Sequence, residues 1–116
     1  MMSNFMDKKI HSTAIIEDGA IIGNNVEIGA YSLIGPKVEI GDDTVVRSHV
    51  VITGRTKIGK NNIIFPFAVI GGVPQDLKYE GEDSLLTIGD NNTIREHVTI
   101  HLGTKAGVMV TKIGND

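Results

Sequence analysis

One short stretch of the sequence concentrates side chains that could bind a polar substrate. It runs from Gln75 to Tyr79 and holds an amide, a carboxylate, an ammonium group and an amphipathic ring. Gln75 can donate and accept hydrogen bonds, Asp76 can accept them, and Lys78 supplies a cation. Because loops on a rigid scaffold often carry function, this stretch is the first candidate binding site. The alternative interpretation is a solvated loop without a role.

Histidine is the other residue type here that could do chemistry near neutral pH. The sequence contains His11, His49, His97 and His101. The spacing of His97 and His101 would suit a metal pair on a helix, but not on the strand repeat described next. We interpret the first three as structural or solvent-facing, and keep His101 as a candidate. We predict no metal site, and we find no nucleophile motif and no glycine-rich phosphate loop before a helix.

A six-residue repeat must position these side chains. Every sixth residue from Ile10 to Ile70 is Ile or Val, without exception. The fourth residue after each of these anchors is small or of medium size, and the next residue after an anchor is often glycine. The complete set of anchors is Ile10, Ile16, Ile22, Ile28, Ile34, Ile40, Val46, Ile52, Ile58, Ile64 and Ile70. This pattern is the hexapeptide repeat of a parallel β-helix.

The repeat has a simple physical explanation. Six is not a helical period, but it suits a short strand followed by a corner, and three such units close a triangular coil of about 18 residues. Ile28 should then stack on Ile10, and Val46 on Ile28, at the strand spacing of about 4.8 Å. Stiff β-branched side chains fill such a narrow prism well. An antiparallel sandwich would instead need turns about every 8–12 residues. The fold class is therefore all-β.

The repeat is interrupted twice. The first break, 71–87, holds two glycines, a proline and a charged run, which make poor strands, so we predict a protruding loop rather than a degenerate coil. A second loop is predicted at 105–112. We expect a lead-in at 1–9 and a repeat domain at 10–116 with about five triangular coils. Because solenoids need capping repeats and no cap is visible, we expect the front portion of a longer protein.

Composition narrows the function classes. The 116 residues carry a net charge of −3, which gives no argument for nucleic acid or for an anionic membrane. The sequence has no cysteine, so it forms no disulfide or thiolate metal site. We find no signal peptide and no apolar run long enough to span a bilayer. These features predict one cytoplasmic domain that is not inserted in a membrane.

Several motifs together closely resemble bacterial UDP-N-acetylglucosamine O-acyltransferases. They are the hexads, the QDLKY segment at 75–79, the segment from Ile94 to Thr104, the segment at 48–52 and the segment at 111–114. Many acyltransferases share the hexad, whereas QDLKY followed by IREHVTIHLGT is far more discriminating. The resemblance covers essentially the whole chain from Ile10.

The resemblance implies a fold and an activity. Enzymes of this family are homotrimers of left-handed β-helices with active sites in grooves between subunits. Without a cofactor, they move a 3-hydroxyacyl chain from acyl carrier protein to the 3-hydroxyl of UDP-N-acetylglucosamine, the first step of lipid A biosynthesis in Gram-negative bacteria. Gln75, Asp76 and Lys78 match family residues that contact the acyl and sugar parts of the substrate. His101 matches a histidine that lines the same groove.

One departure from the family concerns catalysis. The family's general base is a histidine shortly downstream of the segment that matches Gly114, Asn115 and Asp116, and a helical domain that helps to bind the carrier protein follows. We therefore assign no catalytic residue here, expect the base to lie beyond Asp116, and expect these 116 residues alone to be inactive.

Three rival functions stay open beside this resemblance. A lipid A N-acyltransferase carries an extra domain before its hexads. A β-helical carbonic anhydrase needs three converging histidines. The third rival is a trimeric solenoid without catalytic activity.

Overall fold

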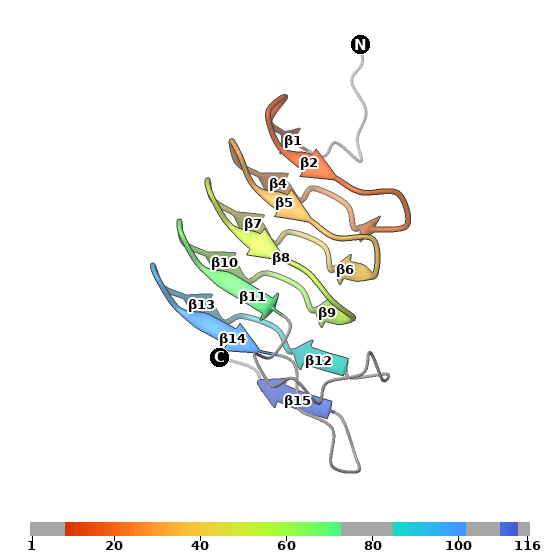
Figure 1. Ribbon diagram of the computed structural model, residues 1–116, viewed down its shortest axis with the longest axis vertical. Helices are drawn as coiled ribbons and strands as arrows, with labels where there is room; N and C mark the ends of the chain where they lie inside the picture. Colours follow the sequence, from red (N-terminus) through yellow and green to blue (C-terminus); the bar gives the residue numbers. More distant parts are fainter. Residues whose placement is uncertain (1–8, 73–84, 102–109, 114–116) are drawn as a thin grey trace.

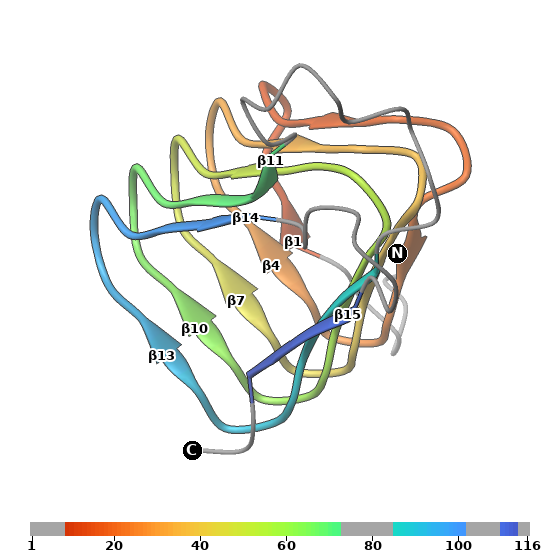
Figure 2. The ribbon, with the colours of Figure 1, turned by 60° about the horizontal axis from the view of Figure 1, so that its bottom comes forward.

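A computed structural model describes residues 9–72, 85–101 and 110–113, and these residues form short strands joined by corners (Figure 1). The chain winds steadily along one direction, and each coil contributes one strand to each of three parallel sheets. Figure 2 shows these sheets as the three sides of a triangular prism. The prediction of an all-β parallel solenoid is confirmed.

Each sheet contains five strands among the described residues. Sheet A holds β1 (Lys9–Ile10), β4 (Glu27–Ile28), β7 (Val45–Val46), β10 (Ile63–Ile64) and β13 (Thr93–Ile94). Sheet B holds β2 (Ile15–Ile16), β5 (Leu33–Ile34), β8 (Val51–Ile52), β11 (Val69–Gly72) and β14 (Thr99–His101). Sheet C holds β3 (Ile21–Ile22), β6 (Val38–Ile40), β9 (Thr56–Ile58), β12 (Leu85–Ile88) and β15 (Val110–Ile113). We name the corners by the sheets they join, so the chain passes an A–B, a B–C and a C–A corner in each coil.

The predicted columns of anchors are present in the core. Ile10 pairs with Ile28, Ile28 with Val46, and Val46 with Ile64, each in register along sheet A. The anchors of the middle coils point inward and are almost fully buried, whereas the anchors of the first coil are more exposed. Burial of such a side chain contributes about 1.5–3 kcal/mol, so the columns provide much of the driving force for folding.

Small polar side chains share the interior with the anchors. They occupy the fourth place after an anchor, and the buried ones are Ser32, Thr44, Thr56, Asn62 and Asn92. Ser32 Oγ donates to the Arg47 carbonyl at 2.8 Å, and Thr44 Oγ1 donates to the Gly59 carbonyl at 2.8 Å. Buried polar groups are tolerated when they are hydrogen-bonded, and these bonds tie each coil to the corner above it.

The coil spacing changes once. Ile40 pairs with Ile58 eighteen residues later, but Ile58 pairs with Ile88 thirty residues later. The coil that contains β11 and β12 is therefore twelve residues longer than a plain coil, and residues 73–84 between these strands lie outside the described residues.

Strand pairing also reaches into both ranges predicted as loops. Gly71 and Gly72 belong to β11, residues 85–87 belong to β12, and residues 110–112 belong to β15. The predicted loop ranges 71–87 and 105–112 therefore include residues that belong to strands. The strand residues 85–87 were not predicted, because the six-residue pattern resumes only at the anchor Ile88. The strand at 110–112 was missed because it has no anchor in phase before Ile113.

In the part of the chain that the structure describes, no helix is long and apolar enough to cross a membrane.

Candidate functional site

Three of the four predicted site residues, Gln75, Asp76 and Lys78, lie outside the described residues. The fourth, His101, is the last residue of β14, and the structure describes its backbone. For the candidate site, the structure therefore gives the geometry of the strands that flank two segments, residues 73–84 and residues 102–109.

The expected position of the catalytic base is not tested by the structure. Asp116, beyond which the family resemblance places the base histidine, lies outside the described residues, which end at Ile113. The assignment of no catalytic residue within this chain, with the base beyond Asp116, therefore stays a prediction.

In sheet B, the strands that precede residues 73–84 and 102–109 pair with each other. Ile70 pairs with Ile100, and after an irregularity in the register Gly72 pairs with His101. The chain therefore enters residues 73–84 directly beside the strand end that carries His101. Because these strands are parallel, β11 and β14 both end at the B–C corner, on adjacent coils.

The strands that follow residues 73–84 and 102–109 also lie side by side. The chain resumes at Leu85 in β12 and at Val110 in β15, and these two residues pair with each other in sheet C. Residues 73–84, which contain Gln75, Asp76 and Lys78, and residues 102–109, which follow His101, are thus flanked on both sides by neighbouring strands. In Figure 1, β12 and β15 lie below the regular coils, next to the end of β14.

The departure of the first segment depends on Gly71. Its φ of +76° lies in the left-handed region, which favours glycine. A Cβ at this position would overlap the Thr53 carbonyl oxygen, and it would lie 2.5 Å from Thr56 Oγ1. No other residue fits at Gly71 without shifting the corner beneath it.

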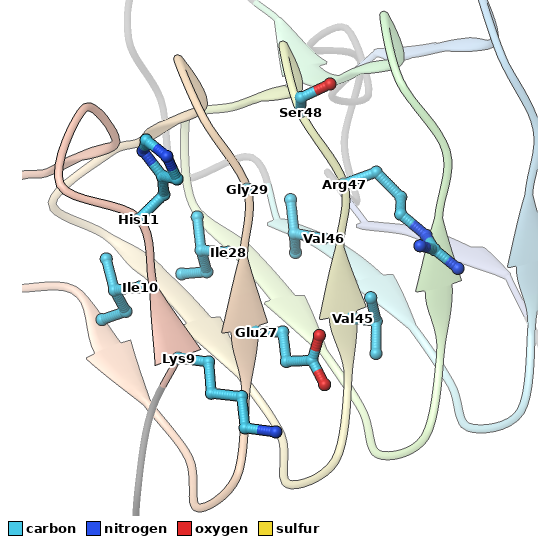
Figure 3. A pocket seen from close by; sticks show the side chains of 10 residues that line it. All are labelled: Lys9, Ile10, His11, Glu27, Ile28, Gly29, Val45, Val46, Arg47 and Ser48. Atoms are coloured by element: carbon cyan, nitrogen blue, oxygen red, sulfur yellow. The ribbon is translucent and has the colours of Figure 1, made fainter.

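A separate hollow of about 520 Å³ lies on the outer side of sheet A. Figure 3 shows that Lys9, His11, Glu27 and Arg47 border it, and that the Arg47 side chain extends away from His11. The Arg47 guanidinium lies 5.7 Å from the centre of the Phe65 ring on the next coil. The basic groups therefore do not converge on one point, and this hollow includes none of the predicted site residues.

Two of the other histidines belong to a column of rings on the A–B corner. His49 lies between Tyr31 and Phe67, with ring centres 5.2 Å and 5.1 Å away, and Phe67 stacks on His97 at 5.5 Å. All four residues have positive φ, between 56° and 66°. We call this set the ring column. The sequence interpretation missed it, although the spacing of eighteen residues between Tyr31, His49 and Phe67 was a visible signal.

A second set of contacts runs beside the ring column. The Arg95 guanidinium lies 4.3 Å from the centre of the Phe65 ring, and Arg95 Nε is 3.2 Å from Glu96 Oε1. A hydrogen bond from the backbone of Glu96, and then the neighbouring Arg95, hold the pKa of the Glu96 carboxyl below its usual value. Both side chains of the ion pair are exposed, so the pair contributes little to stability.

His11 makes a local contact in the first coil. Its Nδ1 accepts a hydrogen bond from the Thr13 amide at 3.1 Å and lies 2.9 Å from Thr13 Oγ1. Within the described ranges, no group of three His, Cys, Asp or Glu side chains could hold a metal ion.

Both the repeat and the whole chain are similar to known proteins. Residues 19–54 match the family model described as bacterial transferase hexapeptide (six repeats). The acyl-[acyl-carrier-protein]–UDP-N-acetylglucosamine O-acyltransferase of Rickettsia peacockii is 53% identical over 115 residues, or 99% of this chain. The chain is a homologue of part of this O-acyltransferase. It spans 42% of that protein's length.

Solved structures agree with this homology. LpxA from Acinetobacter baumannii superposes with a TM-score of 0.87 at 56% identity, covering 91% of this chain and 41% of that chain. The UDP-N-acetylglucosamine acyltransferase of Francisella novicida gives 0.86 at 45% identity, covering 92% and 39%. The resemblance predicted from the QDLKY segment and the hexads is therefore confirmed as homology to LpxA.

Proposed function

We propose that this chain is part of an enzyme that transfers a 3-hydroxyacyl chain from acyl carrier protein to the 3-hydroxyl of UDP-N-acetylglucosamine, the first step of lipid A biosynthesis. The observation that carries the proposal is the pairing of Gly72 with His101. It supports one site at the B–C corner, made from two segments that both match the O-acyltransferases.

The four candidate residues take roles that suit their chemistry. Gln75 and Asp76 bind hydroxyl groups of the sugar or of the acyl chain, since an amide and a carboxylate both accept hydrogen bonds. Lys78 screens a phosphate or guides the thioester arm of the donor. His101 lines the same groove.

The reaction itself needs a base. The sugar hydroxyl attacks the thioester carbonyl, the base removes the hydroxyl proton, and the carrier thiol leaves. In the family this base is a histidine downstream of the segment matching residues 114–116, so its counterpart here would lie beyond Asp116. A general base contributes typically about 10²–10⁴-fold to the rate. We therefore propose that the 116-residue chain alone transfers no acyl group.

Assembly and location complete the proposal. The coils wind left-handed, three copies associate, and the active grooves lie between neighbouring copies in the cytoplasm. No cofactor takes part. The acyl donor is the carrier protein, and the acceptor is the nucleotide sugar.

A direct assay tests the proposed activity. The 116-residue chain and a version extended to the length of its relatives are each mixed with 3-hydroxyacyl carrier protein and UDP-N-acetylglucosamine. We expect acylated sugar nucleotide from the longer version only. If the longer version forms no product, the proposed reaction is wrong. Equal rates from both versions would overturn the assignment of the base beyond Asp116.

A further inference from the structure

We infer that the corner formed by Thr53, Gly54, Arg55 and Thr56 holds both ends of the segment that carries Gln75, Asp76 and Lys78, and that Thr53 and Thr56 are positioning residues for acyl transfer. We call residues 53–56 the anchoring corner. The inference rests on the proposed function for its catalytic consequence, whereas its structural part stands on contacts of described residues alone.

The outgoing end of the segment is fixed on Thr53. The Thr53 amide donates to the Ile70 carbonyl at 3.0 Å, and Thr53 Oγ1 donates to the Gly71 carbonyl at 3.3 Å. Gly71 is itself buried and has positive φ. Two consecutive residues near the end of β11 are therefore bonded to the backbone and to the hydroxyl of one threonine.

The returning end is fixed on the other side of the same corner. The Leu86 amide donates to the Arg55 carbonyl at 3.0 Å, and Leu86 pairs with Thr56 in sheet C. The Leu86 side chain is fully buried, so this end is also part of the core.

A buried hydroxyl joins the two holding points. Thr56 is only 1% exposed, and its Oγ1 donates to the Thr53 carbonyl at 2.8 Å across the turn at Gly54. The same carbonyl oxygen and the same hydroxyl occupy the space that a Cβ at Gly71 would need. Because both ends depend on one hydrogen-bonded turn, removal of either hydroxyl should move the outgoing strand relative to the returning strand.

The coils beneath show that the fold does not require these hydroxyls. One coil earlier the equivalent corner carries Gly35 and Val38, and Val38 pairs with Thr56 while being fully buried. The first coil carries Glu17 and Ala20 there. A valine therefore fills the interior position at this corner without loss of the coil. The two threonines occur on the coil that lies directly below the inserted segment.

Threonine-to-valine variants separate positioning from stability. Thr53→Val and Thr56→Val are made in the version extended to the length of the relatives, with Thr44→Val as the matched control. Thr44 is also fully buried and donates to a backbone carbonyl, but at the C–A corner. Melting temperature, kcat and KM, and the rate of trypsin cleavage after Lys78 in the folded protein are measured for each variant.

We expect Thr44→Val to lose at least as much melting temperature as the two corner variants, because the Thr44 hydroxyl also accepts a hydrogen bond from the Asn62 amide at 3.2 Å. Cleavage after Lys78 should accelerate by about five-fold or more in the corner variants relative to the control, as expected for the loss of one hydrogen bond. Their kcat should fall by about ten-fold or more, because small displacements of positioned groups slow reactions strongly. Thr53→Ser, which keeps the hydroxyl, should restore both values.

One result would contradict the positioning role of the anchoring corner, and another would contradict the proposed function. If Thr53→Val and Thr56→Val match Thr44→Val in both cleavage and turnover, the anchoring corner has no positioning role. If the unmutated protein transfers no acyl group, the proposed function is wrong. Cleavage after Lys78 then decides alone whether the anchoring corner holds the segment.

Discussion

The rings of Phe67 and His97 stack 5.5 Å apart with only 7° between their planes, although thirty residues of sequence separate them. Both residues have positive φ, 66° and 63°, which is strained for bulky side chains. The stacking therefore offsets backbone strain. It also joins the last regular coil to the coil that follows the inserted segment.

Loss of a central ring should weaken the column more than loss of the ring at its end. Phe67 contacts two rings and Tyr31 contacts one, and asparagine tolerates the positive φ at both positions. With aromatic pairs worth about 0.5–1.5 kcal/mol each, Phe67→Asn should lower the free energy of unfolding by about 1–3 kcal/mol and Tyr31→Asn by about half as much. Urea denaturation measures both. Equal losses would show that the column does not act through ring stacking.

Burial of a charge in the anchor columns should unfold the chain. Ile28 is 1% exposed between Ile10 and Val46, so Ile28→Asp places a carboxylate where no partner can reach it. Glu39→Asp, on the outer side of sheet C, should be nearly neutral. Far-ultraviolet circular dichroism and melting temperature compare the two. Similar behaviour of both variants would mean that the inward register is wrong.

Asn62 should be the most sensitive of the buried polar residues. Its Nδ2 donates to the Gly89 carbonyl at 2.8 Å, and its Oδ1 accepts from the Asn92 amide at 2.7 Å. Asn62→Ala removes both bonds and should lower the free energy of unfolding by about 2–4 kcal/mol. The exposed Asn24, on the same type of corner, serves as the control. An Asn62→Ala protein as stable as Asn24→Ala would contradict the role assigned to these bonds.

The sequence was most informative where spacing was constant. The column of Ile10, Ile28 and Val46 follows from the repeat because each coil contains eighteen residues. The stacking of Phe67 on His97 was not predicted, because thirty residues separate them instead of eighteen and their alignment depends on the interruption being a loop and not a whole coil. For the candidate site, the sequence identified residues whose side chains could bind a substrate, but not which of them lie close together. The neighbouring positions of Gly72 and His101 depend on pairing between strands that are far apart in the chain.

Asp76 should matter for turnover and not for folding. In the version extended to the length of its relatives, Asp76→Ala should lower kcat/KM by about ten-fold or more, since it removes an acceptor for a substrate hydroxyl. Its melting temperature should stay within about 1 °C of the unmutated protein, because Asp76 is not one of the anchor residues whose stacking stabilises the core. Asp18→Ala, which removes an exposed carboxylate from the first coil, is the control and should leave both values unchanged. A drop in stability without a drop in turnover would exclude the substrate role.

Association into trimers can be checked by mass in solution. Light scattering or analytical ultracentrifugation of the 116-residue chain at micromolar concentration should report the mass of three copies. The expectation comes from the proposed relationship to the O-acyltransferases. A single species with the mass of one copy would contradict it.

The change from eighteen to thirty residues between paired strands has a consequence for how such a protein can vary. The entropy of closing a loop grows only with the logarithm of its length, by about 0.6 kcal/mol for each doubling. The connection between these two sheets grows from three residues, 53–55, to twelve, 73–84, which is two doublings. The longer connection therefore destabilises the folded chain by only about 1.2 kcal/mol, close to the net contribution of one hydrogen bond. Provided that its two ends stay anchored, this segment can lengthen, shorten or change composition during evolution while the neighbouring coils fold almost unchanged.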